Sequence, residues 1–528
     1  DNTSKIVINY NHFKNRIKKT VEKDGLSYEE LLNGISRLEI VEIVLGENDS
    51  PQKIFESINS TGVKLTTADL IRNFLLMGIL DAGKQAEIYK KYWVTLESLI
   101  TKENIEKFFY DFLVAKDKRY IEESKVYDNF KEYYISNNID DLVGIENIFK
   151  EIIRYAKYYK LLVCNDSKNY GKDSNMYCSM FNILQHRTIY PFLLKVCDDF
   201  NVIQSKYNKE NILSEHELKI VEEKEKEFNN ILKLFGNYAL RRNVADIPSS
   251  SLRRFYSSLY SHIFDKNKNN YECYYKAVES YICTLKTDDK MPNDNVFNAG
   301  LHFGNMYAGA KSKILRYFFD IIENSNKEPV DMTTLTIEHI MPETLSIKWQ
   351  SDLGENYQEI YDKYVHTLGN LSITGYNSEY SNDPFESKKK LFNKLYTTGL
   401  TKIINLNKEL IDDSIIKWGE EEINNRATRL SKIIIDKFPY PTNIDTTLEF
   451  EKYYEFYIDN PDDDGDEYAS SAKYKLYGFQ FDGIKYKSDS YKSIYKDIIR
   501  ILYKIDNNIL DEMAKQNLTY ERGTRVLF

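Results

Sequence analysis

The chain has 528 residues, of which 42% are apolar and 29% are charged, and its formal net charge is −9. This length and composition predict three or four globular domains. No apolar run approaches the roughly 20 residues that span a bilayer, and no signal segment opens the chain, so we expect neither membrane insertion nor export. The negative charge does not exclude DNA binding, because a basic channel can lie on an acidic protein.

The five cysteines are scattered, odd in number and never arranged as C-x-x-C. Their distribution argues against a zinc cluster and against a disulfide framework, and it is typical of the reducing cytoplasm, where we expect the protein. The chain begins with Asp rather than Met, so we expect a fragment or a processed product.

The first part of the chain, residues 1–80, predicts mixed helix with one short extended run at 38–45. Its densest signal is the stretch 55–76, in which Gly62 predicts a turn and either Thr66 or Thr67 can cap the next helix. The predicted apolar face of that helix consists of Leu70, Phe74 and Leu75.

From about 85 to 290 the apolar residues mostly lie three and four positions apart, which predicts a long helical region. A further helix is expected from Ala310 to Glu323. After Pro439 and Pro441, which mark a break, a small module follows at 445–528. It has strand-turn-strand character around Asp482-Gly483 and then a helix at about 491–503.

The stretch 337–377 contains the candidate catalytic and metal-binding residues. Glu338 and His339 are adjacent, and Asn370 and Asn377 follow within forty residues. Hydrolysis of a phosphodiester needs a base for water and a cation for the developing charge. Glu338 and the Asn377 carbonyl are oxygen donors of the kind that Mg²⁺ prefers, and a neutral His339 can accept a proton near pH 7. A strand at 333–340 would point Glu338 and His339 to opposite faces unless its end bends.

These residues resemble the His-Me finger (HNH) superfamily, specifically the nuclease half of GmrSD-type modification-dependent (type IV) restriction endonucleases. The pattern of that family is acid-His-x-x-Pro, then Gly-Asn-Leu, then Asn, then Lys. Its members here are Glu338, His339, Pro342, Gly369, Asn370, Leu371, Asn377 and Lys388.

The resemblance implies a ββα-metal nuclease core with His339 as the general base. Glu338 and Asn377 would bind Mg²⁺ or Mn²⁺, Asn370 would hold the loop that orients His339, and Lys388 would face a phosphate. The other six histidines are expected to be structural or surface residues, although His366 could approach the site because it lies three residues before Gly369.

Residues 51–62 and 65–73 resemble the later part of the ParB-like, nucleotide-using domain of the same enzymes. The Asp-Gly-Gln-Gln-Arg motif associated with nucleotide hydrolysis is absent, and no P-loop replaces it, so no residue here is assigned to a nucleotide. Use of an NTP is expected only of a longer, intact protein.

The expected fold class is predominantly α with small α+β parts. The expected domains are the C-terminal part of a ParB-like domain at 1–85, a helical region at 86–290, the HNH nuclease domain at 291–440 and a small α+β module at 445–528.

Several charged groups have two interpretations. Arg241-Arg242 and Arg253-Arg254 could line a phosphate track, although solvated helix faces are favoured, and Lys388-Lys389-Lys390 could face DNA. Asp69 and Arg72 could form a buried pair that fixes the 55–76 segment, or they could contact a ligand. The acidic run at 459–467 lacks the Glu that a calcium loop needs, so it is interpreted as a surface loop.

The sequence therefore predicts a metal-dependent DNA endonuclease that cleaves modified, foreign DNA such as that of phages. Cleavage of both strands with one site per chain would favour a homodimer. Two alternatives stay open: a catalytically inactive regulator that binds nucleic acid or a partner, and an RNA-cutting toxin that uses the same site.

Overall fold

The structure is a computed structural model in which the chain forms two units, Asp1–Leu65 and Thr66–Phe528. The division after Leu65 falls inside the N-terminal domain expected at 1–85, and the bounds of the four expected domains stay predictions. The residues that the structure describes are 4–39, 65–79, 81–137, 141–163, 172–201, 215–265, 273–324, 331–375, 382–397, 406–407, 410, 412–448, 450, 457–458, 478–481, 484–487, 497–498 and 500–501.

In the first unit the described residues form two helices, α1 (Lys5–Asp24) and α2 (Tyr28–Ser36). Gly25 ends α1 with φ +72°, a left-handed conformation that glycine adopts without steric cost. Ser27 caps α2 and Glu30 bonds back to its amide, which completes a capping box. Most of the extended run expected at 38–45 lies outside the described residues, as does most of the 51–62 segment.

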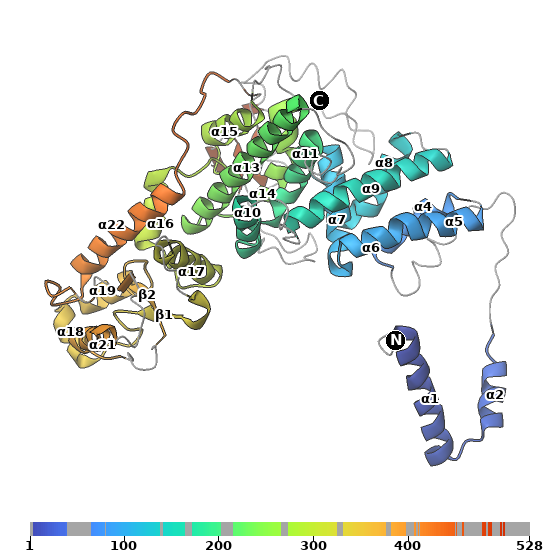
Figure 1. The fold of residues 1–528 in the computed structure, drawn as a ribbon, viewed down its shortest axis with the longest axis horizontal. Helices are drawn as coiled ribbons and strands as arrows, with labels where there is room; N and C mark the ends of the chain where they lie inside the picture. The colour runs from blue at the N-terminus through green and yellow to red at the C-terminus, as the bar shows by residue number, and fades with distance from the viewer. Residues whose placement is uncertain are drawn as a thin grey trace. The chain divides into compact units, whose positions relative to one another are not determined.

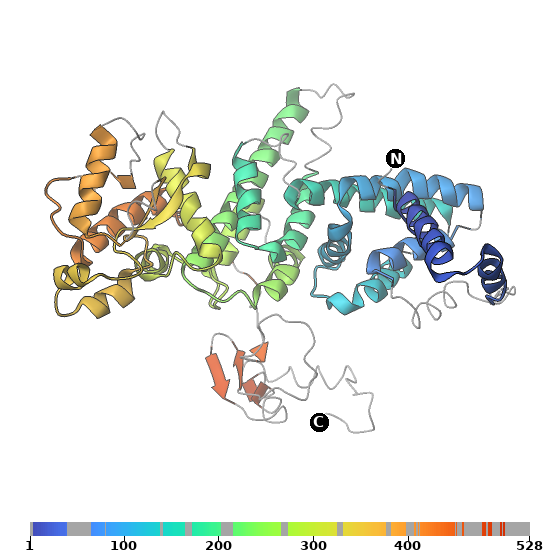
Figure 2. The ribbon, with the colours of Figure 1, turned by 90° about the horizontal axis from the view of Figure 1, so that it is seen from below.

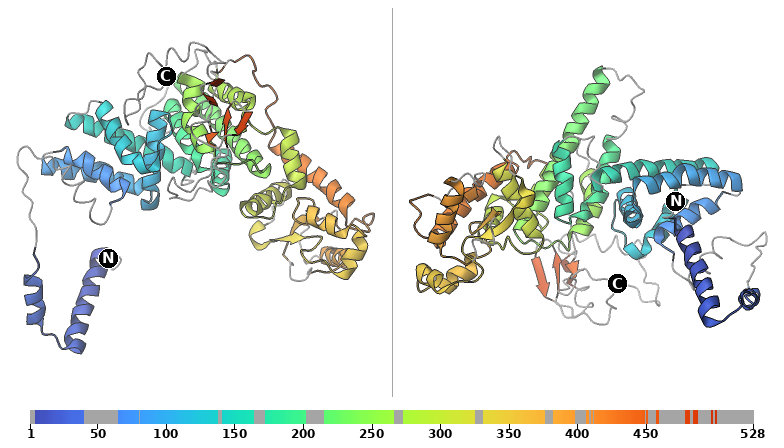
Figure 3. Two further views of the ribbon diagram at one scale, coloured as in Figure 1. Left: turned by 180° about the vertical axis from the view of Figure 1, so that it is seen from behind. Right: turned by 60° about the horizontal axis from the view of Figure 1, so that its bottom comes forward.

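The second unit begins with a helical region, as expected for residues 85–290. Its helices are α4 (Thr67–Met77), α5 (Ala82–Ile88), η1 (Tyr89–Trp93), α6 (Val94–Leu99), α7 (Lys102–Asp117), η2 (Glu123–Lys125), α8 (Val126–Ser136), α9 (Leu142–Val163), α10 (Lys172–Ile183), η4 (Arg187–Ile189), α11 (Tyr190–Phe200), α13 (Glu215–Val244), α14 (Leu252–Tyr260), η5 (Ser261–Asp265) and α15 (Tyr274–Thr284). Figure 1 shows α7, α9 and α11 in this region, and α7 packs against both α9 and α11. The green α13 runs beside α10 in Figure 3.

The start of α4 confirms one sequence prediction and corrects another. Thr66 caps the helix, because its hydroxyl accepts a hydrogen bond from the Asp69 amide at 3.1 Å. The buried face differs from the expected one, since Leu70 and Phe74 are only half-buried. The buried residues are Ala68, Ile71, Leu75 and Leu76. Asp69 and Arg72 do pair, at 2.9 Å, but both side chains remain partly exposed.

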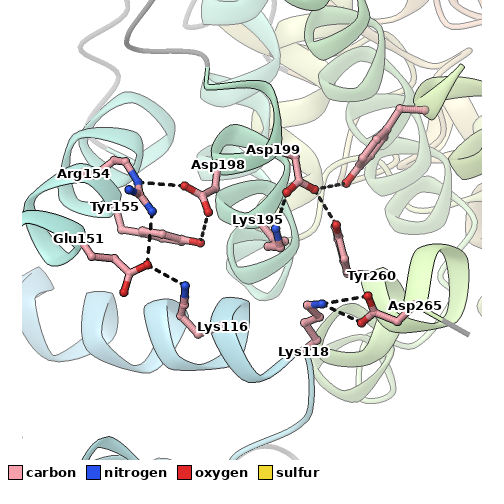
Figure 4. A network of polar contacts seen from close by, with 11 residues as sticks. Lys116, Lys118, Glu151, Arg154, Tyr155, Lys195, Asp198, Asp199, Tyr260 and Asp265 are labelled. Carbon is pink, nitrogen blue, oxygen red and sulfur yellow. Dashed lines mark hydrogen bonds and ion pairs between the residues drawn. The ribbon is translucent and has the colours of Figure 1, made fainter. Parts of the chain in front are cut away.

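A polar network ties the helices of this region together (Figure 4). Arg154 lies 2.9 Å from an Asp198 oxygen, and Glu151 bonds Lys116 at 2.7 Å. The ammonium groups of Lys118 and Lys195 each lie over the Tyr260 ring, 4.9 Å from its centroid. Such contacts fix the angles between packed helices, because each charge finds its partner on a neighbouring element.

Arg241 and Arg242, at the end of α13, are buried, and neither lines a phosphate track or a solvated face. Both alternatives considered from the sequence are therefore wrong for this pair. Their guanidinium groups bond backbone carbonyls on other segments. The acceptors are Pro292, Phe438 and the Asp294 side chain for Arg241, and Asp288, Pro248 and the Tyr238 hydroxyl for Arg242.

The region that follows, beginning with α16, contains a small two-stranded sheet. Its elements are α16 (Asp294–Phe303), α17 (Ala310–Glu323), η6 (Met332–Thr334), β1 (Thr336–His339), α18 (Ile347–Leu353), α19 (Tyr357–Tyr364), β2 (Leu371–Thr374), α21 (Phe385–Thr397) and α22 (Glu420–Lys437). The expected helix from Ala310 to Glu323 is confirmed. The chain is mostly helical, as expected.

The sheet lies between two hydrophobic cores. Leu371 and Ile373 of β2 belong to the large core that continues through the helical region. Ile340 and Met341, just beyond β1, belong to a smaller core with Trp349 and Trp418 among others. α22 packs against α16, α17 and α19 (Figure 1), so this helix spans the region that holds both strands.

The last described segments form a second sheet, of β3 (Tyr457–Ile458), β4 (Gly478–Phe481) and β5 (Ile484–Lys487) in the order β3-β4-β5 (Figure 2). β4 and β5 pair antiparallel, which confirms the two expected strands, and residues 482–483 between them lie outside the described residues. Residues 497–498 and 500–501 are helical, within the expected helix. The acidic run at 459–467 lies outside the described residues. No described helix has the length and apolar character needed to cross a bilayer.

Candidate active site

The candidate site is built at the ends of β1 and β2. The strands pair antiparallel, with Glu338 opposite Ser372 and His339 opposite Leu371. β1 is shorter than the strand expected at 333–340, because residues 332–334 form a 3₁₀ turn. Glu338 and His339 are both buried, so both side chains meet protein on their own face of the strand.

Asn370 joins the two strand ends. Its carbonyl oxygen accepts hydrogen bonds from the Met341 amide at 2.8 Å and from the Trp418 indole at 3.1 Å. Its amide nitrogen donates to the carbonyls of Met341 at 2.9 Å and Val365 at 2.8 Å. All four hydrogen-bonding positions of this fully buried side chain are filled, so Asn370 fixes the segment after His339 against the segment around His366.

The helix α22 supports the turn at 368–371, which carries Asn370. The Arg426 guanidinium is buried and donates to the carbonyls of Gly369 at 2.9 Å and Leu371 at 2.7 Å. A Cβ at Gly369 would lie 2.2 Å from the Ile423 carbonyl oxygen, so only glycine permits this approach of turn and helix.

His339 faces a second histidine. Its Nε2 lies 3.0 Å from Nδ1 of His366, and the Tyr307 ring contacts both imidazoles. Burial, with lesser contributions from His366 and Lys388, lowers the pKa of His339 to about 4. The imidazole is therefore neutral at pH 7, and a neutral imidazole can either accept a proton or bind a cation.

Glu338 points to a different partner, Lys388. The Lys388 ammonium lies 2.7 Å from a Glu338 oxygen and donates to the His339 carbonyl at 2.9 Å. Burial raises the pKa of Glu338 and lowers that of Lys388, and the attraction between them offsets part of both shifts. Lys388 is almost fully buried, so its ammonium is directed inward rather than toward the surface where a phosphate was expected.

The structure brings together a cation-binding set that the sequence did not suggest. His339, Glu343 and His366 each offer one ligand atom, and these atoms lie within 4.8 Å of one another. Two imidazole nitrogens and a carboxylate suit transition ions, whereas Mg²⁺ prefers oxygen donors. The residues therefore fit a divalent cation of the kind that nucleases use, with His339 buried, His366 half-buried and Glu343 exposed.

The other residues that the sequence singled out are Asn377 and the lysines that follow Lys388. Asn377, the second expected metal ligand, lies outside the described residues. Lys389 donates to the Asp412 and Ile415 carbonyls, and Lys390 pairs with Glu386 on the exposed face of α21. Lys390 is thus the member of this lysine run whose side chain is well exposed.

Residues 291–433 match the family model of the C-terminal domain of GmrSD restriction endonucleases. We call residues 291–433 the GmrSD domain, after the family model that they match. The match contains β1, β2 and the histidine centre, which consists of His339, Glu343, His366 and Tyr307. It covers less than half of the chain. No curated protein matches the sequence. The match does not reach residues 51–73, so the ParB-like resemblance stays a prediction.

Four residues that shape the site belong to none of the sequence motifs: Tyr307, Glu343, Trp418 and Arg426. Glu343 follows Pro342 directly, so its place next to the motif was a signal that could have been used. The other three lie 32 residues or more from His339 in the sequence, and only the fold brings them to the site.

Proposed function

We propose that the chain is a metal-dependent DNA endonuclease of the modification-dependent restriction class. The observation that supports the proposal is that the GmrSD domain contains a neutral, buried histidine beside a second histidine and a carboxylate. The substrate would be modified, foreign DNA such as that of phages, and the reaction is hydrolysis of a phosphodiester bond.

In this proposal His339 is the general base. Its neutral imidazole takes a proton from the attacking water, and Asn370 keeps the strand end that carries it in place. Lys388 and Glu338 support His339 from the protein interior. The Lys388 ammonium donates a hydrogen bond to the His339 carbonyl and fixes the backbone there. Their part is to position His339 rather than to contact the phosphate.

In a second assignment His339 is a ligand instead, and a divalent cation binds at His339, Glu343 and His366, with Mn²⁺ favoured over Mg²⁺ by the two nitrogen donors. Such a cation polarises the phosphate and lowers the pKa of a bound water. The alternative ligands are Glu338 and Asn377, for which Glu338 would have to leave Lys388. One nitrogen cannot bind a cation and accept a proton at once, so the His339 nitrogen in this set is either the base or a metal ligand.

Paired measurements on His339→Ala separate these assignments. Mn²⁺ binding is measured by calorimetry, and cleavage of modified plasmid DNA is measured with Mn²⁺ or Mg²⁺, with and without nucleotide. If His339 is the base, cleavage falls about 10²- to 10⁴-fold and Mn²⁺ binding is kept. If His339 is a ligand, both are lost, and Glu343→Gln then weakens Mn²⁺ binding as well.

His302→Ala is the matched control, since His302 lies on α16 in the same domain and outside the ligand set. Equal cleavage by His339→Ala and the unchanged chain would rule out this centre. The buried Glu338–Lys388 pair favours a second candidate, an inactive binding protein, because it occupies an expected metal ligand. Binding of DNA without cleavage under every condition would support it, and a parallel RNA substrate tests the toxin alternative.

A further inference from the structure

We propose that Tyr307 is a positioning residue that holds the imidazoles of His339 and His366 in their mutual orientation. The proposal rests on the proposed function only in that this histidine pair is the reacting centre. Tyr307 lies in the segment between α16 and α17, 32 residues before His339, and it belongs to none of the motifs in the sequence.

The Tyr307 ring contacts both imidazoles in two different geometries. It stacks on His366, with ring centroids 5.5 Å apart and an interplanar angle of 9°. It meets His339 edge-to-face, with centroids 4.6 Å apart and an angle of 79°. These are the two arrangements that aromatic rings favour, so one tyrosine defines the planes of two imidazoles.

The tyrosine is itself held in place by its own segment. The Met306 amide donates to the His366 carbonyl at 2.9 Å, and the Met306 side chain is fully buried. The Asn305 side chain accepts hydrogen bonds from the amides of Tyr307 and Ala308, each at 3.0 Å. The segment is therefore attached to the same residue, His366, on which the Tyr307 ring stacks.

The orientation matters because the ring torsion of histidine is intrinsically broad. Nε2 of His339 and Nδ1 of His366 approach to 3.0 Å only when both rings present the correct edges. A ring packed on the face of one imidazole and against the other restricts both torsions. Tyr307 remains 37% exposed, so it contributes little to the core, and its described ring contacts are with His339 and His366.

The test compares Tyr307→Leu, which removes the ring, with Tyr307→Phe, which keeps it, in the full chain labelled with ¹⁵N-histidine. The control is Phe303→Leu, because Phe303 is an exposed aromatic residue at the end of α16 that has no contact with His339 or His366 among the described ring pairs. The nitrogen signals of His339 and His366 report their shared hydrogen bond, and calorimetry reports Mn²⁺ affinity.

In Tyr307→Leu we expect the nitrogen signals of the pair to change to those of independent, mobile imidazoles, and Mn²⁺ to bind about 10- to 100-fold more weakly. Tyr307→Phe restores both to near the values of the unchanged chain, and Phe303→Leu changes neither. If Tyr307→Leu only lowered stability, the histidine signals of its folded form would stay unchanged. A change in these signals that Tyr307→Phe reverses therefore identifies positioning by the ring.

Unchanged histidine signals in Tyr307→Leu overturn the proposal, whatever the cation result. If the unchanged chain binds no Mn²⁺, the cation site of the proposed function fails. The histidine signals still decide the role of Tyr307 in that case, so the two failures are distinguishable.

Discussion

At the scale of single residues, the ion pair of Lys388 and Glu338 is the buried contact next to His339 whose loss should most affect stability. Both side chains are almost fully buried, and each has lost its contact with water. A buried pair of this kind contributes little net stability, but removal of one partner leaves an uncompensated buried charge. The two residues are therefore expected to tolerate change together better than separately.

Lys388→Met should destabilise the GmrSD domain by about 3–5 kcal/mol, because it leaves Glu338 without a counter-charge. Adding Glu338→Gln to that variant should recover much of the loss. Denaturant unfolding followed by tryptophan fluorescence measures both, since Trp349 and Trp418 lie within the matched region. Lys390→Met, on the exposed side of α21, is the control and should have little effect. Equal stability of the single and double variants would contradict the pairing argument.

His186 links stability to pH. Its Nε2 lies 2.6 Å from the Tyr256 hydroxyl, and burial together with the nearby Arg242 lowers its pKa to about 3. The folded chain therefore binds this proton less readily than the unfolded chain, in which the pKa is near 6.5. The contribution of His186 is fully present above pH 6.5 and is lost as the pH falls toward 3.

The thermal unfolding temperature of the unchanged chain should accordingly decrease as the pH is lowered from 7 to 5. The decrease should be smaller in His186→Gln, because glutamine does not titrate. His216→Gln is the control, since His216 is exposed on α13. Parallel profiles for the unchanged chain and His186→Gln would show that His186 doesn't take up a proton on unfolding.

At the scale of elements, the packing of α22 on the turn at 368–371 shapes the site. Arg426 donates to carbonyls of that turn, and Gly369 lets the backbone approach the helix. That turn also carries Asn370, which holds the segment after His339. A helix that begins 81 residues after His339 thus sets the position of the strand that bears the candidate base.

Gly369→Ala should separate α22 from the turn, because the added Cβ would lie 2.2 Å from the Ile423 carbonyl oxygen. We expect a loss of about 1–3 kcal/mol of domain stability, together with reduced cleavage of DNA. Gly375→Ala is the matched control, since its Cβ would meet only Leu335 at an ordinary 3.7 Å. If both alanine variants unfold at the same denaturant concentration, the close approach is not needed.

At the scale of the whole second unit, Arg241 connects the helical region to both ends of the GmrSD domain. From α13 it reaches the Pro292 carbonyl at 3.0 Å and the Phe438 carbonyl at 2.6 Å. These acceptors lie close to the first and last residues of the match, 291 and 433. The large hydrophobic core also continues from the helices into β2, so the two regions share one interior.

Arg241→Met should therefore destabilise the domain and the helical region together, by about 1–3 kcal/mol for each carbonyl left without a donor. A calorimetric scan should show one transition shifted to lower temperature. Arg254→Met is the control, because Arg254 lies over the Tyr120 ring and bonds neither end of the domain. Two separated transitions in the unchanged chain would contradict the shared interior.

The sequence predicted a substantial part of the local structure for simple reasons. Apolar residues three and four positions apart defined the helical region, and the helix at Ala310–Glu323 was expected with its observed bounds. The Thr66 cap was expected from its position before an apolar run. The face of α4 was predicted incorrectly in part, because periodicity marks a stripe but does not decide which neighbours cover it.

For the candidate site, the sequence by itself determined the motif, and the family match at 291–433 includes it. Only the tertiary structure decided the partners: His366 and Tyr307 against His339, Lys388 against Glu338, and α22 behind the turn. The physical reason is that a motif fixes residue types over a short length of chain. Burial and the pairing of charges depend on segments that only the folded chain brings together.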